Sequence, residues 1–252
     1  MRRRWEGYTQ ERKITRLARE RELLLQARRN RVDFLYKQYR ADHNLMEDRL
    51  LPGYLDICKL GGFASAILTE LSPEAETSRF DIPMTALPDL LQAWKKDIKL
   101  LLMSKLPQLL PVLEEGEVDP GFSALELATT WFRCTLGQGR YNAYATKPGA
   151  VSLEDLPLHK CVAMPGYYSN AEPTWSLDCL VFDSQVSSTI EVFITSVGLN
   201  PKSTTFADMD AANKRWACHS CSTKKPQVFS WRTAVRVPRK HQYPVYLGLV
   251  FP

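Results

Sequence analysis

No stretch of this sequence has the length and apolar character of a membrane-spanning helix, which needs about 20 predominantly apolar residues. Even the leucine-rich run at residues 100–103 lies between Lys99 and Lys105. The opening Met1-Arg2-Arg3-Arg4 is followed by no apolar segment, so we expect no secretory signal. The sequence therefore predicts a protein of the nucleus or cytoplasm without membrane contact, whose six cysteines are thiols or metal ligands rather than disulfides.

The motifs of common enzyme classes are also missing. The sequence has no P-loop, no kinase signature and no G-x-S-x-G nucleophile elbow. Asp208 and Asp210 are paired acids, but they lie at a predicted helix start, where acidic side chains interact favourably with the helix dipole. We therefore expect a protein without enzymatic activity and without a small-molecule substrate.

Proline and glycine are absent between Gly7 and Pro52, and helix-forming residues dominate residues 9–47, which predicts one or two long helices. Residues 1–49 hold 14 Lys/Arg and 8 Asp/Glu, whereas the rest of the chain holds 19 and 20. The positive charge is thus confined to this segment. It is either a solvated helix surface or a nucleic-acid contact through Arg28, Arg29 and Arg31, which is our alternative function.

Apolar periodicity predicts further helices along the chain. Leucines, Trp94 and Ile98 recur at helical spacing over residues 87–106. A capping-box pattern at 123–126 predicts a helix over 124–133, and Thr205 with Asp208 predicts one from Thr205 to Arg215. The β-branched residues of 186–197 favour a strand, but their apolar stripe at helical spacing, followed by Gly198, predicts a helix. Residues 54–70 predict a helix that Gly61-Gly62 breaks or kinks, and residues 72–83 predict a loop.

Two prolines and an acidic stretch after residue 106 predict a linker, so we divide the chain into a basic helical region, 1–118, and a region rich in cysteine and histidine, 119–252. The expected fold is mainly α, with a helical N-terminal half followed by a small, irregular α+β C-terminal half that resembles a zinc finger. We expect metal coordination, rather than a large apolar interior, to order the last hundred or so residues.

The Cys-x-x-Cys turn at Cys218 and Cys221 is the sharpest local signal for metal binding. Such a turn brings two thiolates to one side, each about 2.3 Å from a bound zinc ion. Tetrahedral zinc needs two more ligands, and His241 or His219 can supply an imidazole. A redox pair is the other interpretation, but it calls for a thioredoxin-like βαβ setting that this sequence does not predict.

Cys134, His159 and Cys161 form a second candidate, in which a metal ion would close a loop of 25 to 27 residues. Only three ligands are visible in this group. Cys58 and Cys179 lie in apolar stretches, and we interpret both as small buried apolar residues. The predicted cofactor at both candidate sites is structural zinc.

Several of these segments together carry a family resemblance. They are residues 127–134, 159–161, 198–201, 204–205, 208–210, 215–221 and 230–235. In them the chain resembles a large group of fungal, basidiomycete-type proteins, many of which are predicted F-box-type proteins. The resemblance implies a substrate-recognition or scaffold role and modules of the Cys-x-x-Cys…His type. This chain departs from the pattern at Gly137, where the family has a second cysteine.

From the residues and the resemblance together we expect a non-enzymatic interaction or adaptor protein, related to F-box substrate-recognition proteins and stabilised by structural zinc. The expected partner is another protein. Nucleic acid, bound by the basic N-terminal helix and the zinc-finger-like modules, is the alternative.

Overall fold

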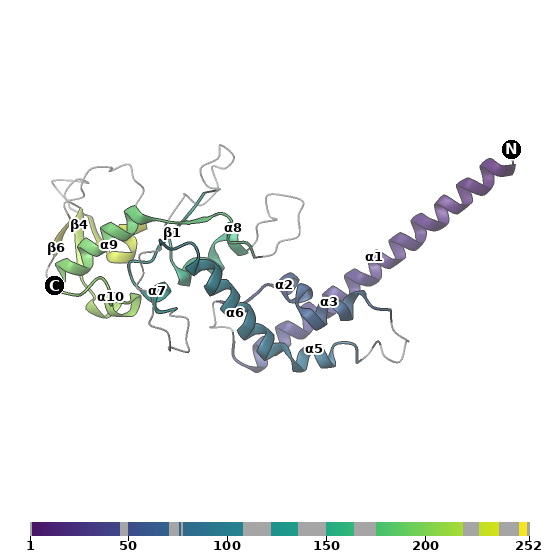
Figure 1. Ribbon diagram of the computed structural model, residues 1–252, viewed down its shortest axis with the longest axis horizontal. Helices are drawn as coiled ribbons and strands as arrows, with labels where there is room; N and C mark the ends of the chain where they lie inside the picture. Colours follow the sequence, from purple (N-terminus) through teal and green to yellow (C-terminus); the bar gives the residue numbers. More distant parts are fainter. Residues whose placement is uncertain are drawn as a thin grey trace. The chain divides into compact units, whose positions relative to one another are not determined.

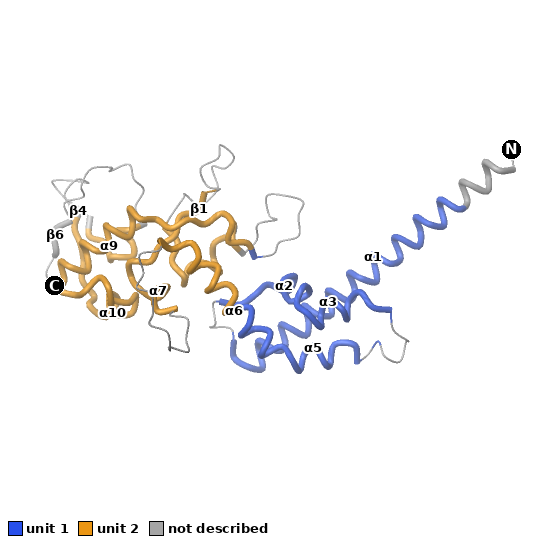
Figure 2. The backbone as a smooth tube through the Cα atoms, viewed as in Figure 1, with its two compact units in different colours: residues 1–95, 168–175 blue, residues 96–167, 176–252 orange. Residues whose placement is uncertain are grey.

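The chain folds into two compact units. The computed structural model describes residues 2–45, 50–70, 76, 78–107, 122–135, 150–163, 175–218, 227–236 and 247–250 (Figure 1). Unit 1 comprises Met1–Lys95 with Tyr168–Trp175, and unit 2 comprises Lys96–Tyr167 with Ser176–Pro252 (Figure 2). The division between the two units along the chain falls between Lys95 and Lys96, inside a helix. Within the described ranges the chain is mainly α, as predicted, and none of their helices could span a bilayer.

A single helix, α1 (Arg2–Asp42), forms the predicted N-terminal helical segment. It ends where Asn44 takes a left-handed backbone conformation with φ of 52°. Only its second half is covered by the rest of unit 1, because Val32 and Tyr36 are buried whereas Ile14 and Leu17 are at least half exposed. Packing therefore stabilises the C-terminal part of α1 far more than the N-terminal part.

The core of unit 1 forms where short helices pack on α1. These are α2 (Tyr54–Lys59), α3 (Gly61–Leu68), α5 (Asp81–Thr85) and the first part of α6 (Leu87–Met103). The predicted break falls at Leu60, whose extended backbone separates α2 from α3. Ile57, Phe63 and Leu87 are fully buried in this core. The loop predicted over 72–83 ends earlier than expected, because α5 already begins at Asp81.

Helix α6 confirms the periodicity seen in the sequence, although it ends at Met103 rather than residue 106. Its apolar stripe contributes Leu87 and Leu91 to unit 1, and the buried residues Ile98 and Leu102 to unit 2.

Unit 2 contains two three-stranded antiparallel sheets. The first has the order β2-β1-β3, with β1 (Phe132–Cys134) between β2 (Ala150–Val151) and β3 (Leu180–Phe182). The second has the order β5-β4-β6, with β4 (Arg215–Cys218) between β5 (Gln227–Ser230) and β6 (Leu247–Val250).

The helix predicted over 124–133 is wrong beyond its first turn. Helix α7 (Ser123–Glu126) ends at Leu127, whose backbone is extended and bridges to Thr205. The chain then continues into β1. Two threonines and two aromatic residues follow at 129–132, and such residues favour the extended chain. Tertiary pairing with Thr205 and with β3 therefore overrides the capping signal.

Helix α9 (Ser184–Ser196) confirms the prediction over 186–197. Asp183 caps its start by accepting a hydrogen bond from the Val186 N–H, at 3.2 Å. Gly198, with φ of 78°, follows its end. Helix α10 (Phe206–Ala212) begins at the predicted Thr205 cap but ends before residue 215, because Asn213 is left-handed and β4 follows.

A genuine apolar core fills unit 2, contrary to the expectation that metal coordination alone would order this region. Trp131, Trp216 and Trp231 are each at most 2% exposed. They pack with α9 residues and with Phe206, whose ring centroid lies 5.5 Å from that of Trp131. Burying aromatic side chains stabilises a domain by several kcal/mol, so a metal would reinforce this core locally and not replace it.

Candidate metal centre

Strand pairing at one edge of unit 2 brings two cysteines together. In β1, Cys134 lies opposite Leu180 of β3, so Cys179 directly precedes the paired position. The Cys179 carbonyl accepts hydrogen bonds from the Thr135 N–H at 2.7 Å and from the Thr135 hydroxyl at 3.1 Å. The backbones on either side of these two cysteines are therefore fixed relative to each other.

His159 and Cys161, the other residues of the site, lie in the segment that follows β2. After β2, the Ser152 N–H and hydroxyl both donate to Asp155 and so cap the start of the 3-10 helix η2 (Leu153–Leu158). His159 caps the end of η2, and Cys161 lies in the short helix α8 (Lys160–Ala163) that follows. An ion pair of 2.7 Å between Glu154 and Arg232 also ties η2 to α11 (Trp231–Arg236).

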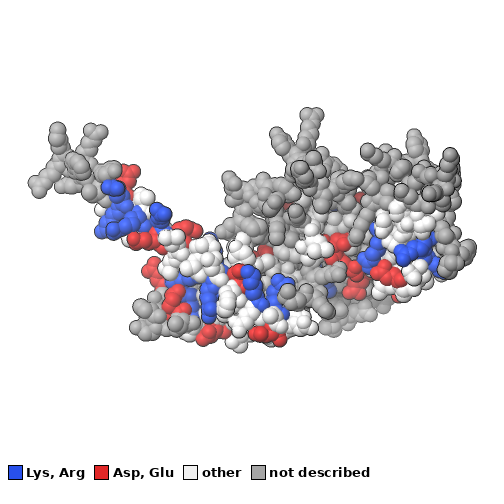
Figure 3. All heavy atoms as spheres, turned by 180° about the vertical axis from the view of Figure 1, so that it is seen from behind, with Lys and Arg blue, Asp and Glu red and all other residues white. Residues whose placement is uncertain are grey.

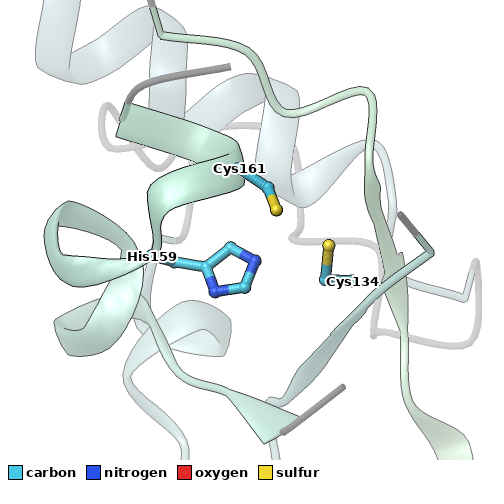
Figure 4. Close-up of side chains that lie close together, drawn as sticks. All are labelled: Cys134, His159 and Cys161. Carbon is cyan, nitrogen blue, oxygen red and sulfur yellow. The ribbon is translucent and has the colours of Figure 1, made fainter. Parts of the chain in front are cut away.

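Cys134, His159 and Cys161 bring their donor atoms within 4.8 Å of one another. The two sulfur atoms face each other, and the imidazole of His159 is directed toward the same space (Figure 4). Two sulfurs on one tetrahedral zinc lie about 3.8 Å apart, given zinc–sulfur distances of about 2.3 Å. Closing this group around an ion therefore requires movements of about 1 Å or less.

His159 presents a buried ring nitrogen that can bind a ligand. Its Nε2 atom is buried and has no hydrogen-bond partner among the described residues. A buried polar atom without a partner costs free energy, and such atoms are rare in native proteins. A metal ion bound at Nε2 would satisfy it, and imidazole nitrogen is a common zinc ligand.

Burial and mutual proximity raise the pKa values of two thiols in this region. Burial, together with the neighbouring Cys134, raises the pKa of Cys161 to about 11. The hydrogen bond with Cys134, followed by burial, raises the pKa of Cys179 well above its usual range. Without a cation these thiols are therefore protonated at neutral pH. A metal ion that binds them must displace protons, as metals bound by thiolates do.

The donor set of two sulfurs and one imidazole suits a soft or borderline ion. Thiolate and imidazole ligands favour zinc over magnesium or calcium, which bind through oxygen. The arrangement can thus hold a metal ion, and the three residues that the sequence grouped lie close together in space.

The second predicted site lies largely outside the described residues. Cys218 is the last residue of β4, but its side chain is not described, and Cys221, His219 and His241 fall outside the described ranges. Their metal binding remains a prediction from the sequence.

The three arginines of the alternative function have different surroundings in unit 1. The side chain of Arg28 is 7% exposed, and it donates to the Ile67 carbonyl at 2.7 Å and to Glu76 at 3.1 Å. Arg29 lies 3.7 Å from Glu22, and Arg31 stacks over the ring of Phe34. Acidic and basic side chains occur together along α1 on the face shown in Figure 3. Arg28 is therefore committed to internal contacts and does not present its guanidinium to a phosphate.

Cys179 is the residue whose place at this site the sequence did not reveal. It is buried, as predicted, but its side chain interacts with that of Cys134 and lies near Cys161. Its proximity depends on the pairing of β1 with β3, which are 45 residues or more apart in the chain. The only sequence signal was the short apolar, strand-like run Leu180–Phe182 that directly follows Cys179.

Comparison of the chain with protein-family models, with curated proteins and with solved structures finds no match.

Proposed function

We propose that this chain is a non-enzymatic interaction protein, an adaptor, whose unit 2 is stabilised by a structural zinc ion held by Cys134, His159 and Cys161. The observation that carries the proposal is the convergence of these three donors within 4.8 Å. One of them, the buried Nε2 of His159, has no hydrogen-bond partner among the residues that the structure describes. Zinc is the ion that best matches two thiolates and an imidazole in this geometry.

The surroundings of the group favour a structural role over a catalytic one. Cys134 is 1% exposed and belongs to a strand in the middle of its sheet. The ring of His159 and the sulfur of Cys161 are partly buried, and the adjoining Val162 is fully buried. A catalytic zinc needs access for water and substrate, whereas a structural zinc cross-links short elements that bury little surface on their own. Here the ion would join β1 to the η2–α8 turn.

The adaptor role is supported by the exposed half of α1. Ile14, Leu17 and Leu24 are 44–59% exposed and lie on one face of the helix, since their spacing of three and seven residues follows the helical repeat. An apolar stripe of this kind fits the groove or helix of a protein partner. The Arg28 guanidinium is occupied by the Ile67 carbonyl and Glu76, which argues against nucleic acid as the ligand of this helix.

Zinc content is the direct test. The full chain would be purified with Cys218→Ser and Cys221→Ser, so that the late cysteine pair cannot contribute, and analysed for metal by elemental analysis. We expect about one zinc per chain, as one structural site requires. His159→Ala should lower the zinc content, whereas Cys58→Ser, which alters a buried cysteine of unit 1, should not. Absence of stoichiometric metal from this background would end the proposal.

A further inference from the structure

We propose that Cys179 is the fourth ligand of this metal ion and that the complete site is a closed set of three cysteines and one histidine. The inference rests on the proposed function, because it needs an ion at Cys134, His159 and Cys161. It goes further by assigning the remaining coordination position to a residue of the chain instead of to water or substrate.

The backbone of Cys179 is held at the rim of the site. Its carbonyl receives both donors of Thr135, the residue that follows Cys134. The Ser176 N–H also donates to the Val162 carbonyl at 3.0 Å, which anchors the segment before β3 to α8. Cys179 is thereby connected to β1 on one side and to the element that carries Cys161 on the other.

The side chain of Cys179 is directed toward the other ligands. It is 5% exposed, and its Sγ donates to the carbonyl oxygen of Cys161 at 3.8 Å, a distance suited to sulfur. It also hydrogen-bonds with the side chain of Cys134. Its sulfur is not one of the three donors that lie mutually within 4.8 Å. Rotation about the single torsion angle that places a cysteine sulfur is the movement that would bring it onto the ion.

Neighbouring acids are poorer candidates for the fourth position. Asp178 is exposed and accepts a hydrogen bond from the Ser176 hydroxyl at 2.9 Å. Asp155 accepts the N–H and the hydroxyl of Ser152 and so forms the cap of η2. Among the described residues of this region, Cys179 is the donor that is both buried and directed at the site. Four protein ligands leave no open position, which is the hallmark of a structural zinc site.

Cobalt substitution tests the ligand count. Apoprotein carrying Cys218→Ser and Cys221→Ser would be reconstituted with Co²⁺, and the sulfur-to-cobalt charge-transfer absorption would be measured. Three thiolates in the parent and two in the Cys179→Ser variant predict a loss of about one third of the intensity, the same loss as in Cys161→Ser. Cys58→Ser is the matched control and should keep the full intensity.

The outcomes separate the two proposals. If the parent binds no cobalt, the proposed function fails. If the parent binds cobalt and Cys179→Ser retains its full intensity, only the assignment of Cys179 is overturned.

A second measurement on the unsubstituted chain does not depend on the folding of a variant. Thiols would be alkylated with and without a chelator, and each cysteine would be quantified by mass spectrometry. We expect the chelator to increase labelling of Cys179 and Cys161 together, and to leave labelling of Cys58 unchanged. Labelling of Cys179 that is independent of the chelator, while that of Cys161 depends on it, would overturn the assignment.

Discussion

Replacing Arg28 by methionine should destabilise unit 1 strongly, although this residue belongs to the most basic stretch of the chain. Methionine keeps most of the aliphatic length of the side chain but removes the guanidinium. The Ile67 carbonyl then loses a buried donor at 2.7 Å, a loss that costs about 1–3 kcal/mol. The pair with Glu76 adds only about 0–1 kcal/mol, because the Glu76 side chain is 39% exposed and still accepts a hydrogen bond from Arg79.

The expected total of about 1–4 kcal/mol corresponds to a fall in melting temperature of roughly 5 °C or more for a unit of this size. Thermal unfolding followed by far-UV circular dichroism would measure it. Arg29→Met is the matched control, since this neighbour is 25% exposed, and its effect should stay within about 0.5 kcal/mol. The reasoning is refuted if Arg28→Met leaves the melting temperature unchanged but weakens binding to DNA and lowers its salt dependence, as loss of a phosphate contact would.

Three further perturbations test the local structure. Hydrogen bonds from Arg79 and Arg28 hold the pKa of Glu76 below its usual value of 4.5, so their stabilisation is present above that pH and is lost as the pH falls through the folded-state pKa. Glu76→Gln should therefore flatten the acid side of the stability curve of unit 1, and superimposable curves would refute this. Gly198→Ala should cost about 1 kcal/mol, because φ is 78° although no atom lies within 4 Å of the added Cβ. Gly61→Ala, inside a helix and equally open, should be neutral or stabilising, and equal effects at both glycines would contradict the backbone argument. Thr205→Ala should cost about 1 kcal/mol of unit 2 stability, because it removes the hydroxyl that accepts a hydrogen bond from the Asp208 N–H at the start of α10. Thr205→Ser keeps a hydroxyl and should keep this hydrogen bond.

Local signals were sufficient for the helices that bury one regular face. The stripe through Leu87, Leu91 and Ile98 predicted α6. The apolar residues at helical spacing over 186–197, followed by Gly198, predicted α9 and its end, although β-branched residues by themselves favour a strand. These elements follow from interactions within a few turns of the chain, so periodicity and caps specify them.

Signals that depend on distant pairing were misread. The capping pattern at 123–126 is real, yet α7 stops after one turn because Leu127 pairs with Thr205 and residues 132–134 pair with β3. The apolar core around Trp131 and Trp216 was likewise underestimated, since its parts come from segments far apart in the sequence.

The candidate metal centre shows the same division. His159 and Cys161 are close in sequence and share one turn, so their pairing could be predicted. Cys134 was grouped with them by residue type alone. Cys179 was assigned to the apolar interior, because nothing in its local sequence shows that β3 will place it beside Cys134.

The central claim is that an ion bound by sulfur and nitrogen cross-links unit 2. X-ray absorption spectroscopy at the zinc edge, on the chain carrying Cys218→Ser and Cys221→Ser, tests it most directly. We predict zinc surrounded by sulfurs at about 2.3 Å and one nitrogen at about 2.0–2.1 Å. A shell of oxygen and nitrogen alone, or no bound zinc, would contradict the account.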